Sequence, residues 1–383
     1  MSDAKLEAWQ KAGLIDAATA ARIKAWEAEH ARPLGLWAAI GIAALAIGLG
    51  LMSLVAANWE AIPGGLRLSI HFALLIGGAA LLWVKERDWT ARQPVLQEAA
   101  LFVFGVLGLT FLGHVGQVYQ TIAPLWQMLV LWLVLFAPLL LARGAGWMTA
   151  GSLMAVLVVA AWAYATATGS PDTALRSGGA TIRIALATGA PVLVAGLAAW
   201  RRGAEDREDF WQRLEQVASI YAVGGASLLA VASAFEAWSG QRDADFILTA
   251  LMIYAAWCAG AAALVFTARR DAAGKAQAGV LLACGLTGLF AYIVSGSQLG
   301  AALLFMALWS VIAAAGLRSG GRGDFQAAVG LIAIRLIVLS FELAGDLLTT
   351  GAGLIASGLL VLAVAFGALR VARRYAPPAE DKA

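Results

Sequence analysis

Charged side chains are scarce in this sequence of 383 residues. Only 13% of the residues are Asp, Glu, Lys or Arg, against about 25% in a typical soluble protein. The two cysteines, Cys258 and Cys284, lie in apolar segments and form no CxxC motif, which excludes a disulfide framework. With 61% hydrophobic residues, this composition excludes an ordinary soluble protein.

Familiar catalytic and binding motifs are also missing. The sequence has no GxxxxGK[ST] loop, which excludes a nucleotide-driven pump on this chain. It has neither an HExxH motif nor a cluster of Cys and His ligands, so we expect no metal and no cofactor. The net charge of +3 is dispersed among loops, so we expect no nucleic-acid partner. These absences favour a protein that is not an enzyme.

Long apolar runs fill most of the chain. A transmembrane helix needs about 20 apolar residues, and barrel strands would alternate over about ten residues instead. We therefore predict an all-α polytopic membrane protein with about twelve spans. They are Leu34–Ala57, Leu66–Val84, Val95–Gly113, Ile122–Ala142, Trp147–Thr168, Ile182–Trp200, Leu214–Phe235, Phe246–Ala268, Gln277–Ser295, Gln298–Leu317, Gln326–Gly345 and Gly351–Leu369.

The lysines and arginines predict the orientation, because cytoplasmic loops are enriched in them. With the N-terminus inside, 22 of the 27 fall in regions expected to be cytoplasmic. The exceptions are Arg67, Arg176, Arg183, Arg242 and Arg335. We therefore predict that both termini are cytoplasmic.

The chain is predicted to have three parts: a cytoplasmic helical hairpin (1–33), a transmembrane domain (34–369) and a basic cytoplasmic tail (370–383). Gly13 should end the first helix of the hairpin, and Asp16 should cap the second. The hairpin is too small to fold robustly alone. We expect it to pack on the membrane domain, on the lipid surface or on a partner.

Polar side chains within the spans are candidate sites, because lipid makes them costly. They gather toward the expected outer face, where Thr110, His114 and Gln117 share one face of the third span. The set predicts a water-accessible pocket open to the outside, lined by the first, second, third and eleventh spans. The candidate ligand-binding residues are Asn58, Glu60, Arg67, His71, His114, Gln117, Tyr119, Gln120, Arg335, Glu342 and Asp346.

Arg335 lies near the expected midplane of the membrane. Glu342 and Asp346 share its helix face, but they stand about 10 and 16 Å away along the axis. We therefore expect its partner to be water or a group on another helix, such as His71, Glu60 or a backbone carbonyl. The alternative is a purely structural ion pair with a neighbouring carboxylate.

Simpler interpretations compete at the other positions. His71 and His114 fit hydrogen bonding to carbonyls, headgroups or water better than a two-histidine metal site. The stretch 58–60 also fits a helix end with Trp59 as an interfacial anchor, and 117–120 fits a tight polar turn.

Several stretches within the first 145 residues carry a family resemblance. They are Gly13–Asp16, Ala25–Glu27, Ala56–Pro63, Gly116–Gln120 and Leu131–Trp132. These stretches resemble the DUF2157 family of bacterial membrane proteins, with a looser likeness at Arg335, Glu342 and Gly345–Leu347. The resemblance implies a multi-pass protein of the bacterial inner membrane and implies no particular activity.

Three functions remain open. The first is transport or sensing of a small solute through the outward pocket. The second is a structural or assembly role in the envelope, with membrane-protein partners bound through the helices and the hairpin. The third is an intramembrane enzyme for lipid-linked substrates, which would need a pair such as His71 with Glu60. Short loops and scattered polar groups make the enzyme the least favoured. The lipid bilayer is the expected surrounding in all three.

Overall fold

The computed structural model describes Leu6, Ala46 and residues 9–29, 62–92, 94–167, 178–202, 208–235, 244–344 and 351–375. All regular secondary structure within these ranges is α-helical, which confirms the predicted fold class. The chain forms two compact units, residues 1–67 and 68–383, and each is described by itself.

The first unit contains a helix end at Gly13 and the helix α2 (Ala17–Glu29). Gly13 has a φ of +69°, and the N–H of Leu14 donates to the Trp9 carbonyl at 3.0 Å. This is the Schellman arrangement that ends many helices. Asp16 Oδ1 accepts from the Thr19 N–H at 2.7 Å, and hydrogen bonds from Thr19 lower the pKa of Asp16. The helix break and the cap are therefore as predicted.

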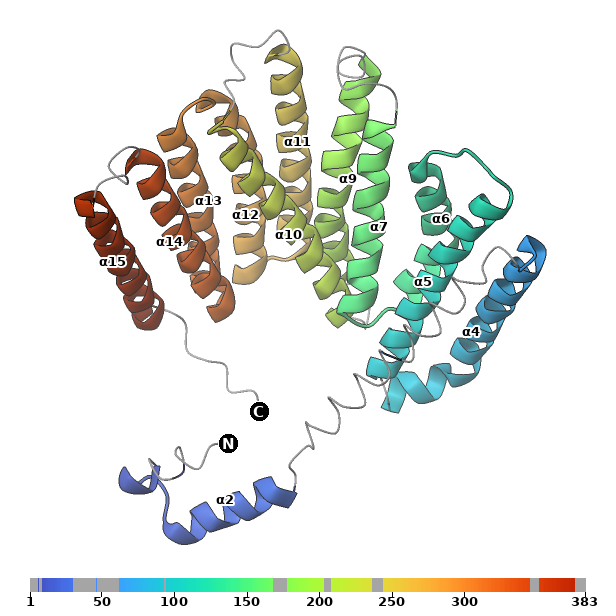
Figure 1. Cartoon of the computed structure of the whole chain (residues 1–383), viewed down its shortest axis with the longest axis horizontal. Helices are drawn as coiled ribbons and strands as arrows, with labels where there is room; N and C mark the ends of the chain where they lie inside the picture. The colour runs from blue at the N-terminus through green and yellow to red at the C-terminus, as the bar shows by residue number, and fades with distance from the viewer. Residues whose placement is uncertain are drawn as a thin grey trace. The chain divides into compact units, whose positions relative to one another are not determined.

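Eleven helices in the described residues are long and apolar enough to cross a membrane. They correspond to the second through twelfth predicted spans and follow one another in chain order (Figure 1). The first predicted span lies outside the described residues, apart from Ala46. The helices are α4 (Gly64–Arg92), α5 (Pro94–Val118), α6 (Leu125–Arg143), α7 (Trp147–Thr166), α9 (Gly178–Arg202), α10 (Glu208–Ala232), α11 (Ala244–Ala268), α12 (Ala272–Ile293), α13 (Gln298–Ser319), α14 (Arg322–Ala344) and α15 (Gly351–Tyr375).

Helix α10 packs against α7, α9, α12 and α13, and Figure 1 shows it crossing α12. Alanine recurs along it at every fourth position, and Ala218, Ala222, Ala226 and Ala230 are all fully buried. Small residues let helix backbones approach closely in a membrane, where dispersion and hydrogen bonds drive association. The close packing along these alanines (the alanine seam) brings polar side chains of α10 into contact with several helices.

Candidate functional site

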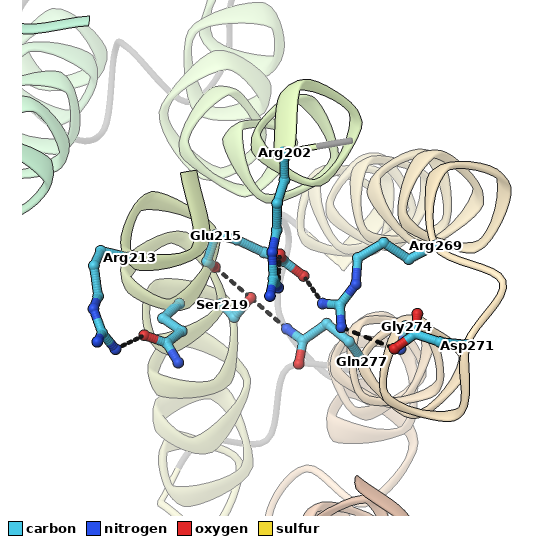
Figure 2. A network of polar contacts seen from close by, with 9 residues as sticks. Arg202, Arg213, Glu215, Ser219, Arg269, Asp271, Gly274 and Gln277 are labelled. Carbon is cyan, nitrogen blue, oxygen red and sulfur yellow. Dashed lines mark hydrogen bonds and ion pairs between the residues drawn. The ribbon is translucent and has the colours of Figure 1, made fainter. Parts of the chain in front are cut away.

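A buried polar cluster surrounds Glu215 of α10 (Figure 2). Glu215 is only 3% exposed, and its Oε1 accepts a hydrogen bond from Arg269 Nη1 at 2.9 Å. Arg202 Nη1 lies 3.6 Å from its Oε2. Arg202 ends α9, and Arg269 directly follows α11. One carboxylate therefore joins the ends of α9 and α11 to α10.

The same cluster reaches α12 by two routes. Arg269 Nη2 pairs with Asp271 Oδ2 at 3.2 Å, and Asp271 caps α12 by accepting from the Gly274 N–H at 3.3 Å. Burial raises the pKa of Asp271, but the Arg269 charge and these hydrogen bonds outweigh it and hold that pKa below its usual value. Deeper in the bundle, Gln277 donates to the Ser219 hydroxyl, which donates to the Glu215 carbonyl.

The charges within this cluster balance. Two arginines face two carboxylates, and Figure 2 shows them meeting from α9, from α10 and from the connection between α11 and α12. A buried ion pair gains little net stability over apolar packing, but removing one partner leaves an uncompensated charge and costs about 3–5 kcal/mol. The relative positions of four helix ends therefore depend on one carboxylate, Glu215. It lies at the end of the spans where the sequence predicts the cytoplasm.

A second carboxylate, Glu98 of α5, caps a helix that it does not belong to. Its oxygens accept from the Ala145 N–H at 3.0 Å and from the Thr149 N–H at 2.9 Å. The Thr149 hydroxyl donates to it at 2.9 Å. Thr149 lies in the first turn of α7, where backbone N–H groups lack intrahelical partners and attract negative charge. Glu98 thus holds α5 to the start of α7.

Three predicted polar residues of the second and third spans meet at the α4–α5 contact. His71 Nδ1 lies 3.4 Å from His114 Nδ1, and His71 Nε2 lies 3.1 Å from the Leu107 carbonyl oxygen. Thr110 Oγ1 is 3.3 Å from His71 Nε2. The Phe111 ring meets His71 edge-on, with ring centroids 5.4 Å apart. Of the face predicted for Thr110, His114 and Gln117, the first two residues therefore contact His71.

The predicted partner of Arg335 was wrong. Arg335 is 6% exposed, and its Nη1 donates to Glu342 Oε2 of the same helix at 3.0 Å. The axial distance overstated the separation because helical side chains lean toward the N-terminus, so Glu342 reaches back. The long arginine stem spans the remainder. The pair matches the structural alternative, and Asp346 lies outside the described residues.

The structure does not bring the whole predicted set together. Helix α4, which carries His71, lies at one end of the row of helices in Figure 1, and α14, which carries Arg335, lies next to α15 near the other end. The described neighbours of α14 are α13 and α15. Arg67 Nε donates to the Ile62 carbonyl at 2.8 Å. Asn58 and Glu60 lie outside the described residues.

The stretch 117–120 ends α5 as a tight polar turn, the simpler of its two interpretations. Gln120 has a φ of +52°, and the Thr121 N–H donates to the Gly116 carbonyl at 3.0 Å. This is again the Schellman arrangement. The Gln120 side chain donates to the Gln117 carbonyl at 3.0 Å, and the neighbouring Tyr119 is exposed.

Glu215 and Glu98 were not among the site residues predicted from the sequence. Arg202 and Arg269 were interpreted only as cytoplasmic loop residues, which hid them as ion-pair partners. A usable signal was present nevertheless, since each glutamate stands near the start of a long apolar segment and a carboxylate there needs a partner.

Comparison with known proteins agrees with the fold. Residues 7–149 match the family model DUF2157, described as a predicted membrane protein. The match confirms the family resemblance over these residues, which include Glu98, His71 and His114. The Glu215 cluster lies beyond the match. No curated protein and no solved structure matches the chain. The chain is a multi-pass membrane protein of the lipid bilayer, and the match assigns it no activity.

Proposed function

We propose that the protein transports or senses a small polar solute in the bacterial inner membrane, with both termini in the cytoplasm. The observation that carries this proposal is Glu215, a buried carboxylate near the end of an apolar span, which faces Arg202 at the end of α9 and Arg269 just after α11. Ionisable groups inside a membrane are costly, and they commonly mark a pathway or a site.

In this proposal the polar cluster around Glu215 is the inner end of the pathway, and this end is closed. Ser219 and Gln277 lie directly beside Glu215. They could hydrogen-bond a solute once Arg202 and Arg269 separate from the carboxylate. The fully buried alanines of α10 then form the closed middle. Opening therefore requires α10 to move against its neighbours.

The outer-end residues receive the solute in the same proposal. Among these residues, His71 and His114 contact each other in the structure. The remaining proposed ligand-binding residues are Asn58, Glu60, Arg67, Gln117, Tyr119, Gln120, Arg335, Glu342 and Asp346. Since Arg335 and His71 lie on helices that are far apart in the row (Figure 1), we propose no single pocket that contains both.

Cysteine labelling tests the inner part of this pathway. The native Cys258 and Cys284 are fully buried and give an unreactive background. Ser219→Cys should react with a membrane-impermeant maleimide applied from the cytoplasmic side, because a working pathway exposes this position part of the time. Ala226→Cys, two turns deeper in the alanine seam, is the control and should stay unreactive. If both cysteines react only after denaturation, the pathway is refuted.

A structural or assembly role in the envelope is the second candidate. The specific observation in its favour is that the Glu98 carboxylate accepts hydrogen bonds from backbone and side-chain donors at the start of α7. Such a contact fixes the position of α7 relative to α5. An assembly role predicts unreactive Ser219→Cys together with partner proteins that cross-link to the helices or to the N-terminal hairpin.

A further inference from the structure

The two imidazoles at the α4–α5 contact have an orientation that the neighbouring backbone fixes. A carbonyl oxygen only accepts hydrogen bonds, so the 3.1 Å contact with Leu107 places a proton on His71 Nε2. In the neutral ring, Nδ1 of His71 then carries a lone pair. That lone pair faces Nδ1 of His114, 3.4 Å away on the other helix. Two ring nitrogens from separate helices therefore lie 3.4 Å apart.

The separation of these nitrogens suits a shared metal ion. A nitrogen–nitrogen distance of 3.4 Å exceeds the range of about 2.7–3.2 Å for good N–H donor bonds. Zinc binds histidine nitrogen at about 2.0–2.1 Å, and two ligands of a tetrahedral ion are then about 3.3–3.4 Å apart. Metal-bound histidines also typically donate their other ring N–H to a carbonyl or carboxylate. Leu107 supplies that carbonyl to His71.

We infer that His71 and His114 bind one divalent transition-metal ion of the zinc class through their Nδ1 atoms. Imidazole suits zinc, copper and nickel. Among the described residues no third His, Cys, Asp or Glu joins the pair, and a zinc ion bound by two histidines needs further ligands to reach four-coordination. The expected position at the outer end of the spans places the ion within reach of the extracytoplasmic solution. This inference does not depend on the proposed solute pathway.

Zinc binding to the purified full-length protein tests the inference. The wild-type chain should retain about one Zn²⁺ per molecule after dialysis and gain thermal stability with added Zn²⁺. His71→Gln and His114→Gln should each weaken binding at least about tenfold. His30→Gln is the matched control, because His30 is the third histidine of the chain, and it should bind as the wild type does. Binding should also fall at about pH 5.5, since a protonated imidazole cannot be a ligand.

A second measurement keeps the inference testable if either variant fails to fold. Cu²⁺ added to the wild-type protein should give an electron paramagnetic resonance spectrum with hyperfine coupling to two imidazole nitrogens. Wild-type protein that retains no Zn²⁺ and shows no such coupling would overturn the inference. So would folded His71→Gln and His114→Gln variants that bind Zn²⁺ like the wild type. Neither result would bear on Ser219→Cys labelling, so the two proposals fail independently.

Discussion

The Tyr221 hydroxyl of α10 donates a hydrogen bond of 2.9 Å to the carbonyl oxygen of Ala187 in α9. Ala187 precedes Pro191 by four residues, and proline has no N–H to offer that carbonyl. In lipid, an unsatisfied carbonyl costs several kcal/mol, and a neighbouring helix can supply the missing donor. Trp162 Nε1 of α7 donates in turn to the Tyr221 oxygen at 3.0 Å. Three helices therefore meet at the proline of α9.

Removing the hydroxyl should destabilise the bundle. Tyr221→Phe leaves the Ala187 carbonyl without its donor, and we expect a loss of about 1–3 kcal/mol in unfolding free energy. In a Pro191→Ala background the new backbone N–H should satisfy that carbonyl, and the cost of Tyr221→Phe should fall. Reversible unfolding in mixed micelles would measure this double-mutant cycle. Equal costs in both backgrounds would show that Tyr221 does not compensate for Pro191.

Glu215→Gln should be strongly destabilising, because it leaves Arg202 and Arg269 facing a neutral amide. We expect a loss of about 3–5 kcal/mol. Asp324→Asn, the same chemical change at an exposed position in the first turn of α14, is the matched control and should cost no more than about 1 kcal/mol, the usual range for a charge at a helix start. Thermal unfolding of the purified variants measures both effects, and a small effect at both positions would contradict the role given to Glu215 in joining the ends of α9 and α11 to α10.

Asp271→Asn should change how stability depends on pH. Because the pKa of Asp271 is lowered in the folded protein, its charge stabilises the fold above the unfolded pKa. That contribution disappears as the pH falls through the folded pKa. Asparagine caps a helix about as well as aspartate, so the comparison isolates the charge. The wild type should be the more stable protein near neutral pH, and the difference should vanish in acid. A difference that grows as the pH falls would have the wrong sign.

Gln120 should tolerate glycine better than alanine. Both substitutions remove the side-chain bond to Gln117, but only glycine adopts the left-handed φ of +52° without steric cost. We expect Gln120→Gly to be more stable than Gln120→Ala by about 1 kcal/mol. Melting temperatures of the two variants provide the comparison, and a more stable alanine variant would argue against the turn at the end of α5.

The sequence predicted the features that depend on local pattern. Apolar length located the spans found as α4 to α15, and Gly13 and Asp16 marked a helix end and a cap. Face sharing on one helix grouped Thr110, His114 and Gln117, and the first two contact His71. These properties follow from backbone periodicity, which the sequence contains directly.

The features that sequence missed depend on contacts between distant segments. Glu215 pairs with Arg269, 54 residues away, and Glu98 binds Thr149, 51 residues away. No periodicity links such positions, so only the packing of the helices reveals them. The Arg335 prediction failed for a different reason. The distance along the helix axis separates the Cα atoms of Arg335 and Glu342, but the direction of the side chains decides whether they meet.

The orientation of the spans is the central claim, since it places the Glu215 cluster at the cytoplasmic end and the His71–His114 pair at the outer end. Reporter fusions after Asp172, Arg202 and Arg374 test it most directly. The account predicts an external signal after Asp172 and cytoplasmic signals after Arg202 and Arg374. If the fusions after Asp172 and Arg202 report the same side, the twelve-span assignment and the placement of both sites are wrong.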